Sequence, residues 1–368
     1  MNNTNYNIAI IGQTGVGKSS LINYLYGEET VETGTGRPVT TNGFHMVKHT
    51  IEGMQVNIYD SWGLEVGKQD QWLKELDEEL KKRGVDKPAS EWFHSIFYCI
   101  SAASARIQDA DIAIIKKLRS EKNKVSIILT KSDAISEDDE KEFITAIKKE
   151  LGFDLAIIPV CSEHKKTRAG ETFQFGKEMV EKQSLIDLID SLILRIPAHC
   201  KEAMLLELRY WRKCTIKSLN SKIDVFGFNV SDLQKEFSAK FQEIAIRIEK
   251  IGNDTENLAL EQYGFIVDKL SYRLELDFDT KYLKLEEANF WSLETLKNIL
   301  PILAKNNLNP LKELSIFSKN IFIKFKENSV KIHKDIDNFC SDIEEKICKR
   351  TQDLEKSLQG IKEELKLI

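Results

Sequence analysis

A glycine-rich run near the N-terminus has the composition and spacing of a phosphate-binding loop. Residues 6–11 before it predict a buried strand, and residues 21–25 after it predict the start of a helix. In such a loop the glycines let backbone N–H groups point at a phosphate, a lysine reaches the β- and γ-phosphates, and a serine hydroxyl ligates Mg²⁺. In this chain those two side chains are Lys18 and Ser19. The run follows the pattern G-x-x-x-x-G-K-[ST] and contains Gly12, Gln13, Thr14, Gly15, Val16, Gly17, Lys18, Ser19 and Ser20.

An aspartate follows the strand predicted at residues 56–60. The chain continues there as Asp60-Ser61-Trp62-Gly63, the pattern D-x-x-G. A carboxylate at the C-terminal end of a strand, opposite the phosphate loop, can hold Mg²⁺ through water. The N–H of Gly63 can then contact the γ-phosphate, so Asp60 joins Ser19 as an expected metal-site residue.

A third motif predicts which base is bound. A buried strand at residues 125–129 ends in Thr130-Lys131-Ser132-Asp133, the pattern [NT]-K-x-D. The carboxylate of Asp133 can accept hydrogen bonds from the N1–H and the 2-amino group of guanine. Adenine offers no such pair of donors, and a buried charge left unpaired is costly, so this residue selects GTP over ATP. The stem of Lys131 is expected to pack on the base.

The last predicted strand, residues 156–160, leads into Cys161-Ser162-Glu163. At this point either Cys161 or Ser162 is expected to give a backbone N–H to the base oxygen. Residues 163–183 are expected to form a loop before the next helix, because the connection is longer than a compact fold needs.

These motifs, in this order and at domain-like spacing, resemble those of the P-loop GTPases of the Ras-like fold over about residues 5–196. Within that superfamily the chain is similar to the Era, septin and interferon-inducible group, through the Thr40-Thr41 pair that follows residues 34–39. The resemblance implies an α/β domain with a mostly parallel sheet flanked by helices, and Mg²⁺-dependent GTP hydrolysis. It also implies a switch threonine as a further metal ligand. Register favours Thr41, with Thr40 as the second choice.

One position departs from the Ras-like pattern. Leu64 follows Gly63, where Ras-like switches carry a glutamine that orients the attacking water. A leucine side chain cannot orient water. We therefore expect slow intrinsic turnover that assembly or a partner stimulates.

Length and charge predict two domains of different character. A chain of 368 residues suits two domains. Composition changes near Pro197, so we expect a GTPase domain at 1–196 and a helical domain at 197–368. The second part holds 28 Lys/Arg and 28 Asp/Glu, a neutral balance that argues against a broad nucleic-acid footprint.

Apolar residues of the second part recur at helical spacing, which predicts a bundle or an elongated hairpin. The C-terminal positions approach a heptad and predict one coiled-coil-like helix of about 40 residues, either packed internally or serving as an oligomer seam. Apolar and aromatic residues at 289–326 form either bundle core or a hairpin tip that touches a bilayer, as in dynamin-like proteins. The heptad-like positions are Ile332, Ile336, Phe339, Ile343, Ile347, Leu354, Leu358, Ile361 and Leu365.

Three functional hypotheses follow. The leading one is a GTP-hydrolysing switch whose helical domain responds to nucleotide state by self-assembly or by membrane or partner contact, as in dynamin-like and interferon-inducible GTPases. The alternatives are an Era-like ribosome- or RNA-associated GTPase and a septin-like scaffold with structural GTP. The six cysteines have no zinc-ligand spacing and are interpreted as reduced cytosolic thiols, so we expect a cytoplasmic protein. No run of 18 apolar residues predicts a membrane-spanning helix, and peripheral membrane contact is left open.

Overall fold

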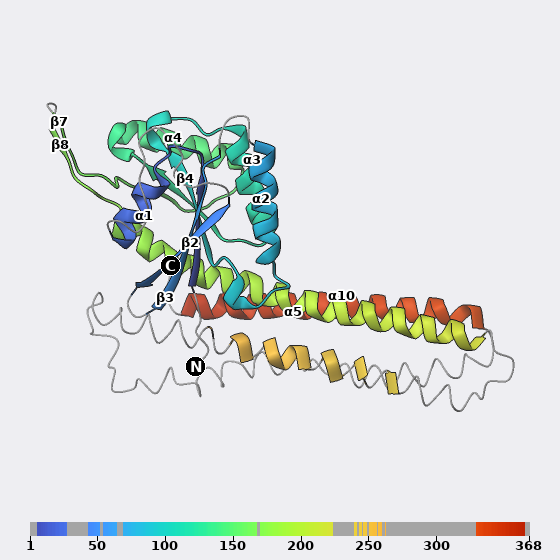
Figure 1. The fold of residues 1–368 in the computed structure, drawn as a ribbon. Coiled ribbons are helices and arrows are strands. Elements are labelled where there is room, and N and C mark those ends of the chain that lie inside the picture. The colour runs from blue at the N-terminus through green and yellow to red at the C-terminus, as the bar shows by residue number, and fades with distance from the viewer. Residues whose placement is uncertain are drawn as a thin grey trace, which may run out of the picture. The chain divides into compact units, whose positions relative to one another are not determined.

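The computed structural model describes residues 6–27, 43–51, 54–64, 69–167, 170–223 and 329–364, together with part of 239–262 (Figure 1). The chain divides into two compact units, Met1–Arg195 and Ile196–Ile368.

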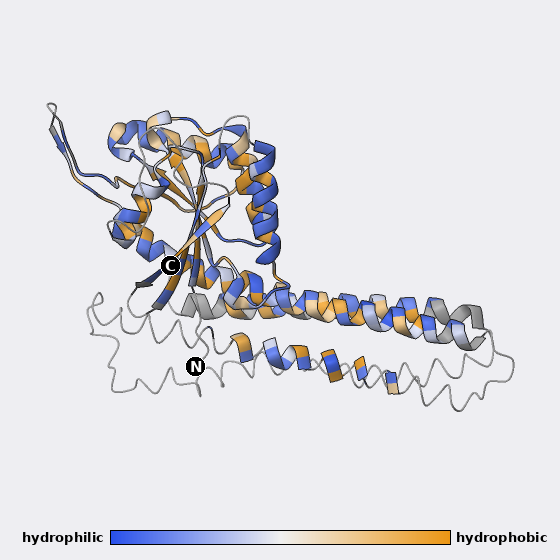
Figure 2. Ribbon diagram, viewed as in Figure 1, coloured by the Kyte–Doolittle hydropathy of each residue, from blue (hydrophilic) through white to orange (hydrophobic). Residues whose placement is uncertain are grey.

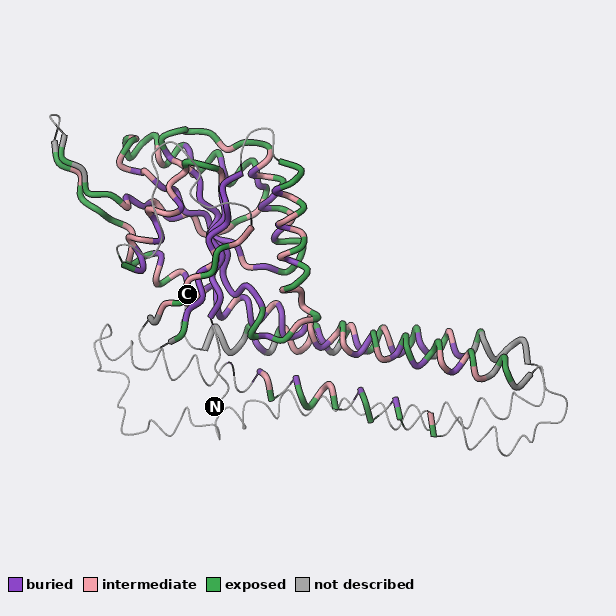
Figure 3. The backbone as a smooth tube through the Cα atoms, viewed as in Figure 1, coloured by how far each residue is buried: buried purple, intermediate pink, exposed green. Residues whose placement is uncertain are grey.

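The first unit is built on a six-stranded sheet with the order β2-β3-β1-β4-β5-β6. Only β2 runs antiparallel to its neighbour β3, and the other pairings are parallel. This confirms the expected α/β fold, a mostly parallel sheet followed by a helical region. Hydrophobic residues concentrate on the central strands, and the same strands are buried (Figures 2 and 3). The strands are β1 (Tyr6–Gly12), β2 (Phe44–Ile51), β3 (Met54–Ser61), β4 (Ser95–Ser101), β5 (Val125–Thr130) and β6 (Ile157–Pro159).

Helices cover both faces of this sheet because its strands are apolar on both faces. Alternate strand residues such as Ile96 and Ile127 share one core cluster with buried residues of α2, α3 and α4. On the opposite face, Ser95 and Ser126 donate hydrogen bonds to the buried Asp187 of α5, at 2.9 and 2.7 Å. The helices are α1 (Lys18–Tyr26), α2 (Gln69–Lys82), α3 (Asp109–Ser120), α4 (Glu137–Leu151) and α5 (Lys177–Ile223), with short 3₁₀ turns at Ala89–Glu91, Ala102–Ser104 and Ser132–Ala134.

The expectation of a plain loop at 163–183 is wrong. The segment contains an antiparallel hairpin of β7 (Lys165–Thr167) and β8 (Gly170–Thr172), and α5 already begins at Lys177. The ring of His164 stacks on Phe173 at 5.4 Å between centroids, and its Nε2 lies 2.8 Å from Glu171 Oε1. These cross-strand contacts stabilise the hairpin, although each strand has only three residues.

The change of composition near Pro197 does not end a helix, because α5 continues through that proline. A proline inside a helix removes one backbone hydrogen bond. Ile193, Ile196 and Cys200 around it are buried, so the apolar stripe continues across the proline. The boundary between the two compact units, at residues 195 and 196, therefore falls inside one helix.

The second unit contains residues 196–223 of α5 and the helix α10 (Ser329–Glu364). Arg212 of α5 pairs with Asp337 of α10 at 2.7 Å, and Trp211 Nε1 donates to the carbonyl of Lys240 at 3.0 Å. Residues 289–326 lie outside the described part of the chain. No described helix is long and apolar enough to cross a membrane. Heptad-like positions of α10 that are buried within the chain are Ile336, Ile343, Ile347 and Leu358.

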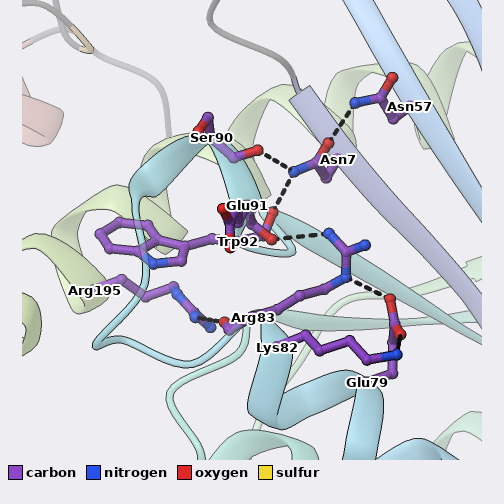
Figure 4. Close-up of polar contacts among 9 residues, drawn as sticks. All are labelled: Asn7, Asn57, Glu79, Lys82, Arg83, Ser90, Glu91, Trp92 and Arg195. Carbon is purple, nitrogen blue, oxygen red and sulfur yellow. Dashed lines mark hydrogen bonds and ion pairs between the residues drawn. The ribbon is translucent and has the colours of Figure 1, made fainter.

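A buried arginine joins three segments of the first unit at the end of the sheet opposite the phosphate loop. Arg195 is 1% exposed. Its Nη1 donates to Asn123 Oδ1 at 2.7 Å, and its Nη2 donates to the carbonyl of Arg83, just beyond α2. Arg83 in turn bonds Glu79 and the carbonyl of Glu91 (Figure 4). Burial lowers the pKa of Arg195 to about 10, so the guanidinium stays charged at neutral pH.

Replacing this arginine should destabilise the first unit. Arg195→Ala leaves the Arg83 carbonyl and the Asn123 amide oxygen without their donor and opens a cavity, so we expect a loss of about 2–4 kcal/mol in the free energy of unfolding. Urea titration measures it. The matched control is Arg106→Ala at an exposed position of the same unit, which should change stability by less than about 0.5 kcal/mol. Equal effects of the two substitutions would contradict the structural role of Arg195.

Candidate functional site

The glycine-rich loop connects β1 to α1, and its backbone requires glycine at two positions. A Cβ on Gly12 would lie 2.5 Å from the carbonyl oxygen of Cys99. Gly17 has φ +100° and precedes α1 without a side-chain cap on the helix. The first-turn N–H groups of a helix have no partner within the helix. The N-terminus of α1 therefore offers donors and a positive dipole to an anion.

Lys18 begins α1 and is 7% exposed. Its ammonium donates to the carbonyls of Gly12 and Gln13, at 3.0 and 2.9 Å. Burial lowers the pKa of Lys18, and the nearby Asp60 carboxylate opposes that shift. The loop carbonyls thus hold a cation inside the loop.

Asp60 lies near the end of β3, in register with Ile10 of β1. It is 1% exposed, and its Oδ1 has no hydrogen-bond partner among the described residues. Burial raises the pKa of Asp60 to about 6, against the opposing charges of Lys18 and His45. A buried carboxylate oxygen without a partner is costly unless water or a cation satisfies it.

Gly63 and Leu64 are held against the phosphate loop. The N–H of Thr14 donates to the Leu64 carbonyl at 3.1 Å, and the Leu64 N–H donates to the Gly12 carbonyl at 3.3 Å. A Cβ on Gly63 would lie 2.4 Å from Thr14 Oγ1, so only glycine allows this approach. The Leu64 side chain is 7% exposed and belongs to the core cluster with Trp62. The sequence did not suggest this anchoring role for Leu64.

The Thr130–Asp133 motif also contacts the phosphate loop. Lys131 Nζ donates to the Gly15 carbonyl at 2.8 Å, and Thr130 Oγ1 donates to the Val16 carbonyl. Asp133 follows in a 3₁₀ turn and is half-buried. The fold thus brings the predicted base-reading motif to the predicted phosphate site.

The two candidates for the base N–H differ in this structure. The N–H of Cys161 donates to the Phe175 carbonyl at 3.2 Å, so it is already committed. The hydroxyl of Ser162 is buried without a partner among the described residues. The N–H of Cys161 therefore has a protein partner in this structure.

Two contacts of the loop were missed by sequence reasoning. Gln13 Nε2 donates to both carboxylate oxygens of Asp111, each at 3.0 Å, and Ser20 Oγ donates to Glu163 Oε1 at 2.9 Å. Their partners lie 98 and 143 residues away in sequence, and no local pattern marks them. The switch candidates Thr40 and Thr41 lie outside the described residues.

A mostly parallel sheet, a glycine-rich loop leading into a helix and a D-x-x-G segment bonded to that loop are the features of the P-loop GTPase fold. In agreement, residues 7–131 match the model of the family described as 50S ribosome-binding GTPase.

Curated relatives match part of the chain. It is 25% identical to Cell division control protein 10 of Saccharomyces cerevisiae, over 43% of this chain and 56% of that protein. It is 32% identical to Septin-8-A of Danio rerio, over 40% of this chain and 39% of that protein. It is 31% identical to the tRNA modification GTPase MnmE of Clostridioides difficile, over 37% of this chain and 27% of that protein. The chain thus spans about half or less of the length of these relatives.

A solved structure, Toc33 from Arabidopsis thaliana in complex with Mg²⁺ and GMPPNP, is also similar. It is 19% identical, covers 52% of this chain and 86% of its own, and has a TM-score of 0.38.

The raised pKa of Asp60 predicts a pH-dependent effect of neutralising it. Its folded pKa of about 6 lies above the usual 3.8, so ionisation destabilises the native state as pH rises between these values. Asp60→Asn should therefore raise the free energy of unfolding of the nucleotide-free protein at pH 7 by about 1–3 kcal/mol. The gain should vanish near pH 4.

Urea titrations at several pH values, without nucleotide or Mg²⁺, measure this difference. Asp138→Asn is the control, because its carboxylate is 95% exposed. A gain in the free energy of unfolding of Asp60→Asn that is the same at every pH, or a loss at pH 7, would contradict the raised pKa of Asp60.

Proposed function

We propose that this chain binds GTP and GDP with Mg²⁺ and hydrolyses GTP as a molecular switch. The observation that carries the proposal is the pair of bonds from Lys131 and Thr130 to the Gly15 and Val16 carbonyls. These bonds support the proposal because they join a motif suited to guanine to a loop suited to phosphate. A single nucleotide can span both.

Each site residue has a proposed role. Backbone N–H groups of residues 15–20 and the ammonium of Lys18 bind the phosphates. Asp133 accepts the guanine donors, and Ser162 faces the base oxygen. Thr130 and Lys131 hold the base motif against the loop.

The metal-site residues we propose are Ser19, Asp60 and the switch threonine, Thr41 before Thr40. The buried Asp60 Oδ1, without a partner among the described residues, suits a hard cation that prefers oxygen ligands. Mg²⁺ neutralises charge that develops on the phosphate oxygens during transfer. Gly63, which lies against Thr14, is proposed to contact the γ-phosphate.

Slow turnover follows from the place of Leu64. Its side chain is packed in the core, so it supplies no group that orients water. We propose that self-assembly completes the site. We also propose a GTPase domain at 1–196 and a helical domain at 197–368 that responds to nucleotide state. In this proposal the helical domain resembles that of dynamin-like or interferon-inducible GTPases and makes peripheral contact with a membrane.

The septin-like alternative, a scaffold with structural GTP, is favoured by the match to Septin-8-A. An Era-like RNA-associated role has less support, because the 28 Lys/Arg of residues 197–368 are balanced by 28 Asp/Glu.

Base selection can be tested by Asp133→Asn. The amide no longer accepts both guanine donors but can donate to the 2-oxo group of xanthine, so GTP affinity should fall at least about tenfold and preference should move to xanthosine triphosphate. Equilibrium titration with fluorescent nucleotides measures both. Lys18→Ala is the control, since it should abolish binding of either nucleotide. Unchanged GTP selectivity in Asp133→Asn would refute the base assignment.

The rate of GTP hydrolysis at different protein concentrations can distinguish the switch hypothesis from the scaffold hypothesis. If self-association completes the site, the GTP turnover per molecule should rise with protein concentration, while ATP turnover stays at background. Phosphate release measured over a wide range of protein concentration tests this. A flat, slow rate would contradict completion of the site by assembly and favour a structural nucleotide or a separate activator.

A further inference from the structure

The base loop, residues 161–163, contacts the phosphate-loop helix through a side chain that the nucleotide motifs do not use. Glu163 Oε1 accepts a hydrogen bond from Ser20 Oγ at 2.9 Å. Ser20 lies in the first turn of α1, directly after Ser19. The bond therefore joins the segment proposed to hold the base to the segment proposed to hold the phosphates.

The other side of the base loop is fixed by the segment that returns from β8. Cys161 and Phe175 exchange two backbone hydrogen bonds, at 3.2 and 3.1 Å, and Gln174 Nε2 donates to the Ser162 carbonyl at 2.8 Å. Cys161 Sγ also donates to the Glu163 carbonyl at 3.2 Å. The loop backbone is thus tied to the hairpin segment, and Glu163 ties it to α1.

We propose that the hydrogen bond from Ser20 to Glu163 is a latch that holds the base loop against the phosphate-loop helix and slows nucleotide release. The inference rests on the proposed nucleotide binding. A nucleotide that spans the two segments leaves faster when they can separate, and a hydrogen bond to a carboxylate is stronger than a neutral one. Holding both segments in the bound arrangement reduces the ordering cost of binding.

Charge repulsion alone predicts the opposite effect on the rate of nucleotide release. A carboxylate beside a phosphate site repels the nucleotide, so without a latch its removal would slow release. The sign of the change in the release rate therefore separates the latch from simple charge repulsion.

A double-mutant cycle on the full chain tests the latch. GDP carrying a fluorescent methylanthraniloyl group is bound, and its release is followed after excess unlabelled GDP is added. Glu163→Ala and Ser20→Ala, which keeps the backbone N–H, should each speed release by about two- to tenfold. The double variant should be no faster than the faster single variant, because both substitutions remove the same bond.

The matched control is Glu171→Gln, which removes a carboxylate that pairs with His164 in the same hairpin. It should release the nucleotide at the wild-type rate. Unchanged or slower release in Glu163→Ala, or single effects that multiply in the double variant, would overturn the latch alone. Failure of the wild-type chain to bind the labelled GDP would overturn the proposed function and the latch with it.

Discussion

The arrangement of the site depends on two buried groups of opposite charge, Lys18 and Asp60. The parallel pairing of β1 with β3 sets Asp60 beside Ile10, close to the strand end from which the loop carrying Lys18 departs. Burial lowers the pKa of the lysine and raises that of the aspartate, so each group is less stable charged than it would be in water. A ligand that brings both an anion and a cation would satisfy both groups, which is the chemistry of a metal-bound phosphate.

The phosphate loop is also the point where distant segments of the first unit meet. Its carbonyls accept hydrogen bonds from Leu64 and Lys131, and its Thr14 N–H donates to Leu64. Its backbone passes so close to Cys99 that Gly12 has no room for a side chain. These bonds replace partners that loop backbone groups would otherwise find in water. A change in the loop would therefore be felt directly in the D-x-x-G segment and in the base motif.

Local sequence patterns predicted much of the first unit, but they could not predict its long-range contacts. The apolar runs predicted the strands seen as β1, β3, β5 and β6. The hairpin was missed because three-residue strands carry too little alternation to indicate a strand. The two compact units divide at residues 195 and 196, beside the expected boundary at Pro197, but the sequence did not predict that α5 continues through this proline. The bond from Ser20 to Glu163 needs the tertiary fold, so no spacing rule could reveal it.

Helix α5 shows how buried polar groups specify one arrangement of a largely apolar surface. Apolar side chains alone allow a helix to slide or rotate on a sheet at modest cost. Asp187 accepts hydrogen bonds from Ser95 and Ser126, and Arg195 donates one to Asn123, so a shift of the helix would break these buried bonds. These groups lie two turns apart and fix both the rotation and the axial position of residues 187–195 on the sheet. Helix α5 continues without a break to Ile223, so the segment fixed on the sheet and the first part of the helical region belong to one helix.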